Sequence, residues 1–218
     1  MEKTIRVTGR GILSLAPDSI RLELQLVDLS DTYADAMRRM AALTGQLQAA
    51  LAAVGFAPDA LKTSHMGVEE RREGYQDDKG VWRERFLGYA CTHAMTLTFP
   101  RSSERLSRTL TALSSCEAKP AVSVRYTMRD PERIKNELLG RAVADAAEKA
   151  RRLAEAAGVA LGEVRSIDYS WGQLELLSRT ERSVKLAAAA GANDALSFDI
   201  EPEEIRLEDT VSVIWAIG

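Results

Sequence analysis

The sequence predicts an α+β fold built from two βαβ-like halves, in which mainly antiparallel or mixed sheets pack against helices. The strand-like segments alternate apolar and polar residues instead of forming continuous apolar runs, as in sheets with one open face. Helical segments connect these strands along the chain. An alanine-rich helix over residues 138–157 precedes a closing strand, Ile205–Ile217, so small helix residues face large strand residues. These three observations predict helix–sheet layers.

Two strands open the chain. Residues 5–9 read as a short strand, after which Gly9 and Gly11 are expected to interrupt the chain. Alternating leucines then predict a half-buried strand over residues 20–26.

A helix and a hairpin follow. Ser30 or Asp31 is a suitable N-cap for the helix, which is expected to end at Gly55. Residues 61–73 and 81–99 then predict two paired strands. Together they form a long projecting hairpin near residues 61–99.

The next elements repeat this pattern of helix and strand. Ser102 or Ser103 is expected to cap a short helix, and residues 122–128 alternate as a strand. Asp130 and Pro131 open the long helix, because aspartate caps a helix and proline fits its first turn.

The C-terminal third holds the long helix and the closing strand. Gly158 ends the helix, and a strand is predicted over residues 164–171. Residues 172–193 have no clear period and are interpreted as a flexible or partner-ordered excursion. We expect a single domain over residues 1–218, or two lobes of about residues 1–100 and 101–218.

Composition and charge limit the classes of function. The chain has 218 residues, 45% hydrophobic and 28% charged, with a net charge of −3. Without a basic excess, nucleic-acid binding has no electrostatic support. No apolar stretch is long enough to span a membrane, and no signal-peptide core is present, so the sequence predicts a cytoplasmic protein, or a periplasmic one if a signal was removed. Gly9-Arg10-Gly11 lacks the third glycine of a dinucleotide site, and no cofactor is expected.

Several short motifs in a fixed order carry a family resemblance. They are Ile5-x-Val7-x-Gly9-x-Gly11, Pro17-Asp18, Thr63, Gly88-Tyr89, the helix over 142–157 with Gly158, Leu161-Gly162-Glu163-Val164, and Ile200-x-Pro202-x-x-Ile205. Together they resemble the SIMPL-domain family of bacteria, whose function is largely unknown. The resemblance implies exported relatives and oligomers in at least some cases. It implies no catalytic residues.

Two histidines and a cysteine are the candidates for a metal site. Cys91 and His93 share one strand face, and His65 is the only other histidine. The alternative is that residues 89–99 form a core-facing row with His93 as its one hydrogen-bonded polar member.

The hairpin arm holds the candidates for a protein interface. Aromatic residues alternate there with arginines, a combination typical of interface anchors. The candidates are Tyr75, Trp82, Arg83, Arg85 and Phe86. The alternative is a solvated edge protected against aggregation. Asp77 and Asp78 are interpreted as turn residues.

These observations leave three functions open. The first is a non-enzymatic assembly or binding protein, which forms a homo-oligomer and can bind a protein partner. The second is a small-molecule or metal-binding protein with a pocket between the two halves. The third is an enzyme of unrecognised class, which is disfavoured because no catalytic set of acid, base and nucleophile is found.

Overall fold

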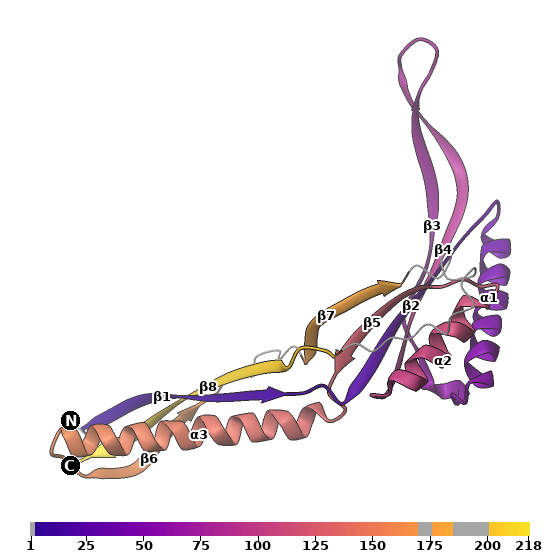
Figure 1. Ribbon diagram of the computed structural model, residues 1–218. Coiled ribbons are helices and arrows are strands. Elements are labelled where there is room, and N and C mark those ends of the chain that lie inside the picture. Colours follow the sequence, from indigo (N-terminus) through magenta and orange to yellow (C-terminus); the bar gives the residue numbers. More distant parts are fainter. Residues whose placement is uncertain (1–2, 170–175, 185–200) are drawn as a thin grey trace. The chain divides into compact units, whose positions relative to one another are not determined.

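The computed structural model describes residues 3–169, 176–184 and 201–218 (Figure 1). In chain order its elements are β1 (Thr4–Leu15), β2 (Ser19–Ser30), α1 (Tyr33–Ala53), the 3₁₀ turn η1 (Pro58–Ala60), β3 (Leu61–Gln76), β4 (Trp82–Pro100), α2 (Ser103–Ser114), β5 (Ala121–Thr127), α3 (Pro131–Ala156), β6 (Leu161–Asp168), β7 (Leu177–Val184) and β8 (Ile205–Ile217). The strand pairings β1–β8, β2–β4, β3–β4 and β6–β8 are all antiparallel. The α+β prediction is confirmed.

The chain forms two compact units that interleave along the sequence. Unit 1 contains Met1–Asp18, Thr127–Arg179 and Pro202–Gly218, and unit 2 contains Ser19–Tyr126 and Thr180–Glu201. This division differs from the expected lobes of about residues 1–100 and 101–218. The reason is that β1 pairs with β8 along its whole length, so the two ends of the chain share one sheet.

Unit 2 contains most of a five-stranded sheet with the order β3-β4-β2-β5-β7, of which β7 begins within the unit 1 segment that ends at Arg179. Helices α1 and α2 cover one face of it, and a single buried cluster fills the space between them. Alternate residues of β2 and β4 supply the sheet side of this cluster: Ile20, Leu22, Leu24, Leu26, Cys91, Met95, Leu97 and Phe99. Among the described residues, no helix covers the other face of the sheet.

Two of the three observed helix N-caps agree with the sequence prediction. Ser102 caps α2 and Asp130 caps α3, each accepting a hydrogen bond from a main-chain N–H three residues on. The α1 prediction of Ser30 or Asp31 is wrong, because Thr32 is the N-cap and its hydroxyl accepts from the Asp35 N–H at 3.2 Å.

Unit 1 is a three-stranded sheet with the order β1-β8-β6 and with α3 against one face. The buried face of α3 is a stripe of small and large residues: Ile134, Leu138, Ala142, Ala146, Ala150 and Ala154. The closing strand was predicted at its observed bounds, and its alternate residues pack against this stripe.

Gly9 and Gly11 lie inside β1 and do not interrupt it. A Cβ at Gly9 would lie 2.0 Å from the Ala142 carbonyl oxygen, and one at Gly11 would lie 2.2 Å from that of Leu138. The expectation of a short strand is therefore wrong. The glycines allow the helix to approach the strand backbone, and β1 continues to Leu15.

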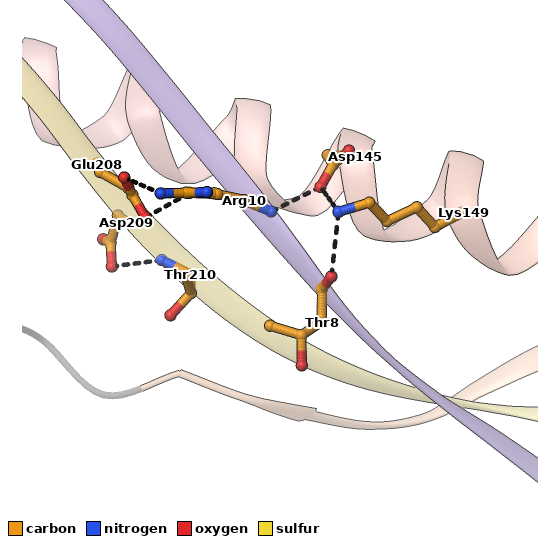
Figure 2. A network of polar contacts seen from close by, with 7 residues as sticks. All are labelled: Thr8, Arg10, Asp145, Lys149, Glu208, Asp209 and Thr210. Atoms are coloured by element: carbon orange, nitrogen blue, oxygen red, sulfur yellow. Dashed lines mark hydrogen bonds and ion pairs between the residues drawn. The ribbon is translucent and has the colours of Figure 1, made fainter.

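Charged residues of α3 bind the outer edge of β1 (Figure 2). The Arg10 N–H donates to the Asp145 carboxylate at 2.7 Å, and the Lys149 ammonium donates to the same carboxylate at 2.6 Å and to the Thr8 carbonyl at 3.5 Å. One turn earlier, the Arg141 guanidinium donates to the Ile12 carbonyl. These side chains satisfy main-chain groups that face away from β8.

β6 begins and ends three residues earlier than the sequence predicts. Its pairing with β8 shifts register between Leu161 and Val164 and again between Val164 and Ser166. These two bulges place Leu161, Val164 and Ile167 opposite alternate residues of β8, so the apolar positions recur every third residue. The period of two that identifies a strand is therefore absent. The segment 172–193, apart from 176–184, and Trp171 lie outside the described residues.

Candidate functional site

The outer part of the β3–β4 hairpin is a two-stranded ribbon. The pairing of β2 with β4 ends at Ser30 and Tyr89. Beyond that point, within the described part of the chain, β4 pairs with β3 alone, and the ribbon of unit 2 extends past α1 and α2 (Figure 1). We call residues 71–88 the distal ribbon.

A glycine and a bulge mark the base of the distal ribbon. Gly88 is buried with φ +135°, and a Cβ there would lie 2.5 Å from the Ser30 carbonyl oxygen. The register shifts beside it, between Arg71 and Arg72, which leaves Leu87 as the extra residue of a bulge. Because bulges bend and twist a strand, this position turns the ribbon away from the sheet.

Asp77 organises the turn at the tip. Its carboxylate accepts the main-chain N–H groups of Lys79 and Val81, each at 3.0 Å, and the Arg83 Nε–H at 2.6 Å. The hydrogen bond from Arg83 is the main reason that the pKa of Asp77 lies below its usual value. Gly80 adopts φ +75°, which the turn requires.

On one face of the distal ribbon, charged side chains form ion pairs with one another. Tyr75 lies opposite Arg83, and Glu73 opposite Arg85, so these four side chains share a face. Arg85 donates to Glu73 through Nε at 2.7 Å, and its guanidinium lies 5.9 Å from the Tyr75 ring centre. With Asp77 bound to Arg83, both arginines that β4 places on this face have an acidic partner.

The other face is open, and we call it the apolar face after its two aromatic side chains, which it carries between the polar residues Arg72, Gln76 and Glu84. Trp82 lies opposite Gln76 and Phe86 opposite Arg72, with exposed fractions of 72% and 50%. Gly74 leaves room beside the indole, since a Cβ there would lie 3.8 Å from the Trp82 ring. Phe86 is supported from below by Tyr89, with ring centres 5.3 Å apart.

The five interface candidates are therefore divided between two faces. Trp82 and Phe86 lie together on the apolar face, whereas Tyr75, Arg83 and Arg85 lie on the ion-paired face. The sequence places all five on the hairpin, but their division depends on the register that the turn imposes.

The three metal-ligand candidates are not brought together. His93 lies in the core row, 6% exposed, with Nδ1 3.0 Å from the Thr44 hydroxyl and Nε2 2.9 Å from the Thr63 hydroxyl. Burial lowers the pKa of His93, which favours a neutral ring that donates to one hydroxyl and accepts from the other. Cys91 is also in this row, and burial raises the pKa of its thiol.

His65 lies on the other side of the sheet. It pairs with Ala94, whose side chain alternates with that of His93 and so points to the open face. There it lines a shallow concavity of about 440 Å³ together with Glu69, Arg71 and Thr92. Within residues 3–169, 176–184 and 201–218, no three His, Cys, Asp or Glu side chains are grouped to hold a metal ion.

The motifs behind the family resemblance have structural roles in the chain. Gly9 and Gly11 admit α3, Thr63 binds His93, and Gly88 forms the ribbon base. The Asp18 carboxylate accepts the Arg129 N–H at 2.7 Å, which ties the strand connection to the segment before α3. These residues explain the fold rather than a reaction.

The exposed apolar edge at β6 is a surface that sequence reasoning missed. Val164 and Ile167 are 49% and 56% exposed. Their spacing of three residues does not match the period of two that identifies a regular strand. The bulges that produce this spacing leave no distinct mark in the sequence.

Comparisons with known proteins identify a family and two relatives. A family model described as "SIMPL: Protein of unknown function (DUF541)" matches residues 5–215. The chain is also similar to the "26 kDa periplasmic immunogenic protein" of Brucella melitensis biotype 1 and to that of Brucella abortus (strain S19). Each is 28% identical over 164 residues, which cover 75% of this chain and 65% of the relative's length.

The expectation of a cytoplasmic protein is contradicted by these relatives, because both are named periplasmic proteins. In the described part of the chain, none of the helices combines the length and apolar character that crossing a bilayer requires. The match over residues 5–215 covers almost the whole sequence, and the chain therefore belongs to the SIMPL family.

Proposed function

We propose that the chain is a non-enzymatic assembly protein of the periplasm, which self-associates through the apolar face of the distal ribbon. The observation that carries this proposal is Trp82, which is 72% exposed on a ribbon whose opposite face is closed by ion pairs. Tryptophan is among the residues most enriched at the centres of protein interfaces. A second copy that covers Trp82 and Phe86 removes their apolar surface from water.

The distal ribbon is ordered by its own contacts, which favours such an interface. Asp77 fixes the turn, Gly88 fixes the base, and the Glu73–Arg85 pair orders the opposite face. An ordered surface loses less conformational entropy on binding than a mobile one does. Phe86 is also held by Tyr89, so both apolar side chains start from supported positions.

The size of the ribbon limits the strength of this contact. Six or seven residues in each strand span about 20 Å. One face of such a ribbon offers less than the about 800 Å² per partner of a standard stable interface. We therefore expect weak association through the ribbon alone, and tighter assembly only where another surface contributes.

Light scattering at tens of micromolar, with size-exclusion separation, tests the proposal. The wild-type chain is expected to show a mass above that of the monomer, and Trp82→Ala and Phe86→Ala are expected to lower it. Tyr75→Ala, on the ion-paired face of the same ribbon, is the matched control and should keep the wild-type mass. A wild-type mass unchanged by Trp82→Ala contradicts the proposal.

The periplasmic location has its own test. It is supported by the names of the relatives and is extended here to this chain. Osmotic shock of the source cells should release the full-length protein with the periplasmic fraction. Retention with cytoplasmic enzymes contradicts the location and leaves the ribbon contact untouched.

Small-molecule binding is the second candidate function, and the concavity on the open face of the five-stranded sheet favours it. Its volume of about 440 Å³ is within the range of small-ligand sites, and it combines Val27 and Leu29 with charged groups. Native mass spectrometry of protein from its own cells should then show a bound small molecule, which His65→Ala releases. Elemental analysis decides the metal form of this candidate, because no stoichiometric zinc, copper or iron removes it. The earlier expectation of a pocket between the halves stays a prediction.

A further inference from the structure

The two flanks of α3 differ in chemistry. One flank carries Arg141, Asp145 and Lys149, at successive turns, and these bind the outer edge of β1. Figure 2 shows Asp145 and Lys149 of this flank. A strand edge covered in this way is closed to pairing with another chain. Val143 and Ala147 lie on the opposite flank, about 120–160° around the helix from these residues, and therefore face the β6 side of the sheet.

The β6 edge is open and apolar in the described part of the chain. β6 is the last strand of its sheet, and β8 is its one pairing partner among the described residues. Val164 and Ile167 lie opposite Trp215 and Val213, which pack against α3, so all four are on the helix face of the sheet. A single helix covers β1 and β8 but leaves these two side chains about half exposed.

The main-chain groups of Val164 face outward. In an antiparallel pair, the N–H and C=O of one residue point to the same side. On β1, the main-chain groups of Thr8, Arg10 and Ile12 face away from β8. Ile5 is at the alternate position, so its main-chain groups face β8. Because Ile5 pairs with Trp215, the main-chain groups of Trp215 face β1. Val164, opposite Trp215, thus directs its N–H and C=O away from β8. The same holds for Leu161 and Ile167.

We propose that two copies of this chain pair their β6 strands antiparallel, with a two-fold axis at Val164. In this register Val164 faces Val164 of the other copy, and Leu161 faces Ile167. Glu163 of one copy faces Arg165 of the other, and the same pair recurs on the far side of the axis. The two three-stranded sheets become one six-stranded sheet, with an apolar floor between the two α3 helices.

A second copy fits this edge because the edge is complementary to itself. The bulges lie on either side of Val164, so the outward groups recur at the same interval in both directions. The charged residues next to the axis have opposite signs, and in the single chain Arg165 and Glu163 already lie 3.9 Å apart. An interface that repeats one patch about a two-fold axis needs this property.

This inference rests on the proposal that the chain self-associates, but it uses a different surface from the distal ribbon. The β6 pairing adds main-chain hydrogen bonds, which are the usual source of affinity when a strand extends a sheet. It also supplies the further contact that the small ribbon requires.

Charge reversal on β6 tests the register. Glu163→Arg and Arg165→Glu each place like charges across the axis twice, so each should weaken β6 pairing at least about tenfold. A mixture of the two variants restores both attractive pairs and should form a heterodimer in excess over either homodimer. Glu155→Arg, on the solvent side of α3, is the charge-matched control and should pair as the wild type does.

Native mass spectrometry of the variants, each with and without Trp82→Ala, separates the two surfaces. With Trp82→Ala present, the β6 dimer should remain, and Glu163→Arg should reduce it to monomer. A heterodimer no more abundant than the homodimers, or single variants that pair as the wild type does, overturns the β6 inference. If Trp82→Ala alone changes no mass while the charge variants behave as expected, the ribbon proposal fails and the β6 inference stands.

Discussion

Gly9 of β1 lies so close to Ala142 of α3 that a Cβ at Gly9 would sit 2.0 Å from the Ala142 carbonyl oxygen. No side-chain rotation relieves this distance, because the obstructing atom belongs to the helix backbone. The helix and the strand must therefore separate if Gly9 is replaced.

Gly9→Ala should lower the free energy of unfolding by about 3 kcal/mol, since an added methyl group cannot be absorbed in a close-packed layer. Gly140→Ala is the matched control in α3, because a Cβ at Gly140 meets nothing within 4 Å. It should raise the free energy of unfolding by about 0.5–1 kcal/mol. Urea denaturation measures both values, and equal effects would contradict the close approach.

His93 should make the stability of the chain depend on pH. Burial lowers its pKa in the folded chain below the value of 6.5 for an unfolded histidine. Below that value the unfolded chain binds more protons, so stability is lost as the pH falls, by at most about 1.4 kcal/mol per pH unit.

His93→Gln removes this dependence. Denaturation of both chains between about pH 5 and 7.5 measures it, in the range where an ordinary histidine titrates. Parallel curves for the wild type and the variant would show that His93 titrates as an unfolded histidine does.

The sequence predicted those features that depend on neighbouring residues. Asp130 caps α3 and Ser102 caps α2 because capping is decided within one turn, and the alternation of β8 is visible along its own length. The meaning of Gly9, by contrast, depends on a helix more than a hundred residues away. From neighbouring residues alone, Gly9 indicates a break in a strand, but in the structure it is the position where α3 packs against β1.

The candidate surfaces show the same limit. The hairpin and its aromatic residues were visible in the sequence, but the pairing of Trp82 with Gln76 that separates the two faces is set by the turn. At β6, two bulges convert an alternating strand into apolar positions three residues apart. Neither bulge has a residue pattern that distinguishes it from a loop.

Tyr169 should ionise at a higher pH than an ordinary tyrosine does. Its hydroxyl donates to the Asp209 carboxylate at 2.6 Å, and this bond and partial burial raise the pKa of Tyr169 to about 12. The raised pKa contributes stability that is complete below about pH 10 and is lost as the pH rises toward 12. Absorbance titration should show one tyrosine that ionises at a higher pH than the others. This transition should be absent in Tyr169→Phe and should move to lower pH in Asp209→Asn.

Asp145 should stabilise unit 1 through its bonds to Lys149 and to the Arg10 N–H. Asp145→Ala should lower Tm by about 2–4 °C, because it removes a carboxylate with two donors. Glu148→Ala is the control, since the Glu148 carboxylate forms an exposed ion pair with Arg152 on the same helix, and such a pair contributes little to stability.

The stability that Asp145 contributes should be lost in acid. The hydrogen bond from Lys149, followed by that from Arg10, lowers the pKa of this carboxyl group below 3.8. Its contribution is present above that value and is lost as the pH falls below it. Calorimetry of the wild type and of Asp145→Ala should therefore give converging Tm values in acid, and a constant difference would contradict this.

The central claim is that the apolar face of the distal ribbon joins copies of this chain, and the mass of Trp82→Ala beside that of the wild type tests it most directly. Sedimentation equilibrium at tens of micromolar should give an oligomer for the wild type and for Tyr75→Ala, and a smaller species for Trp82→Ala. A wild-type monomer, or one mass for all three chains, would contradict the claim.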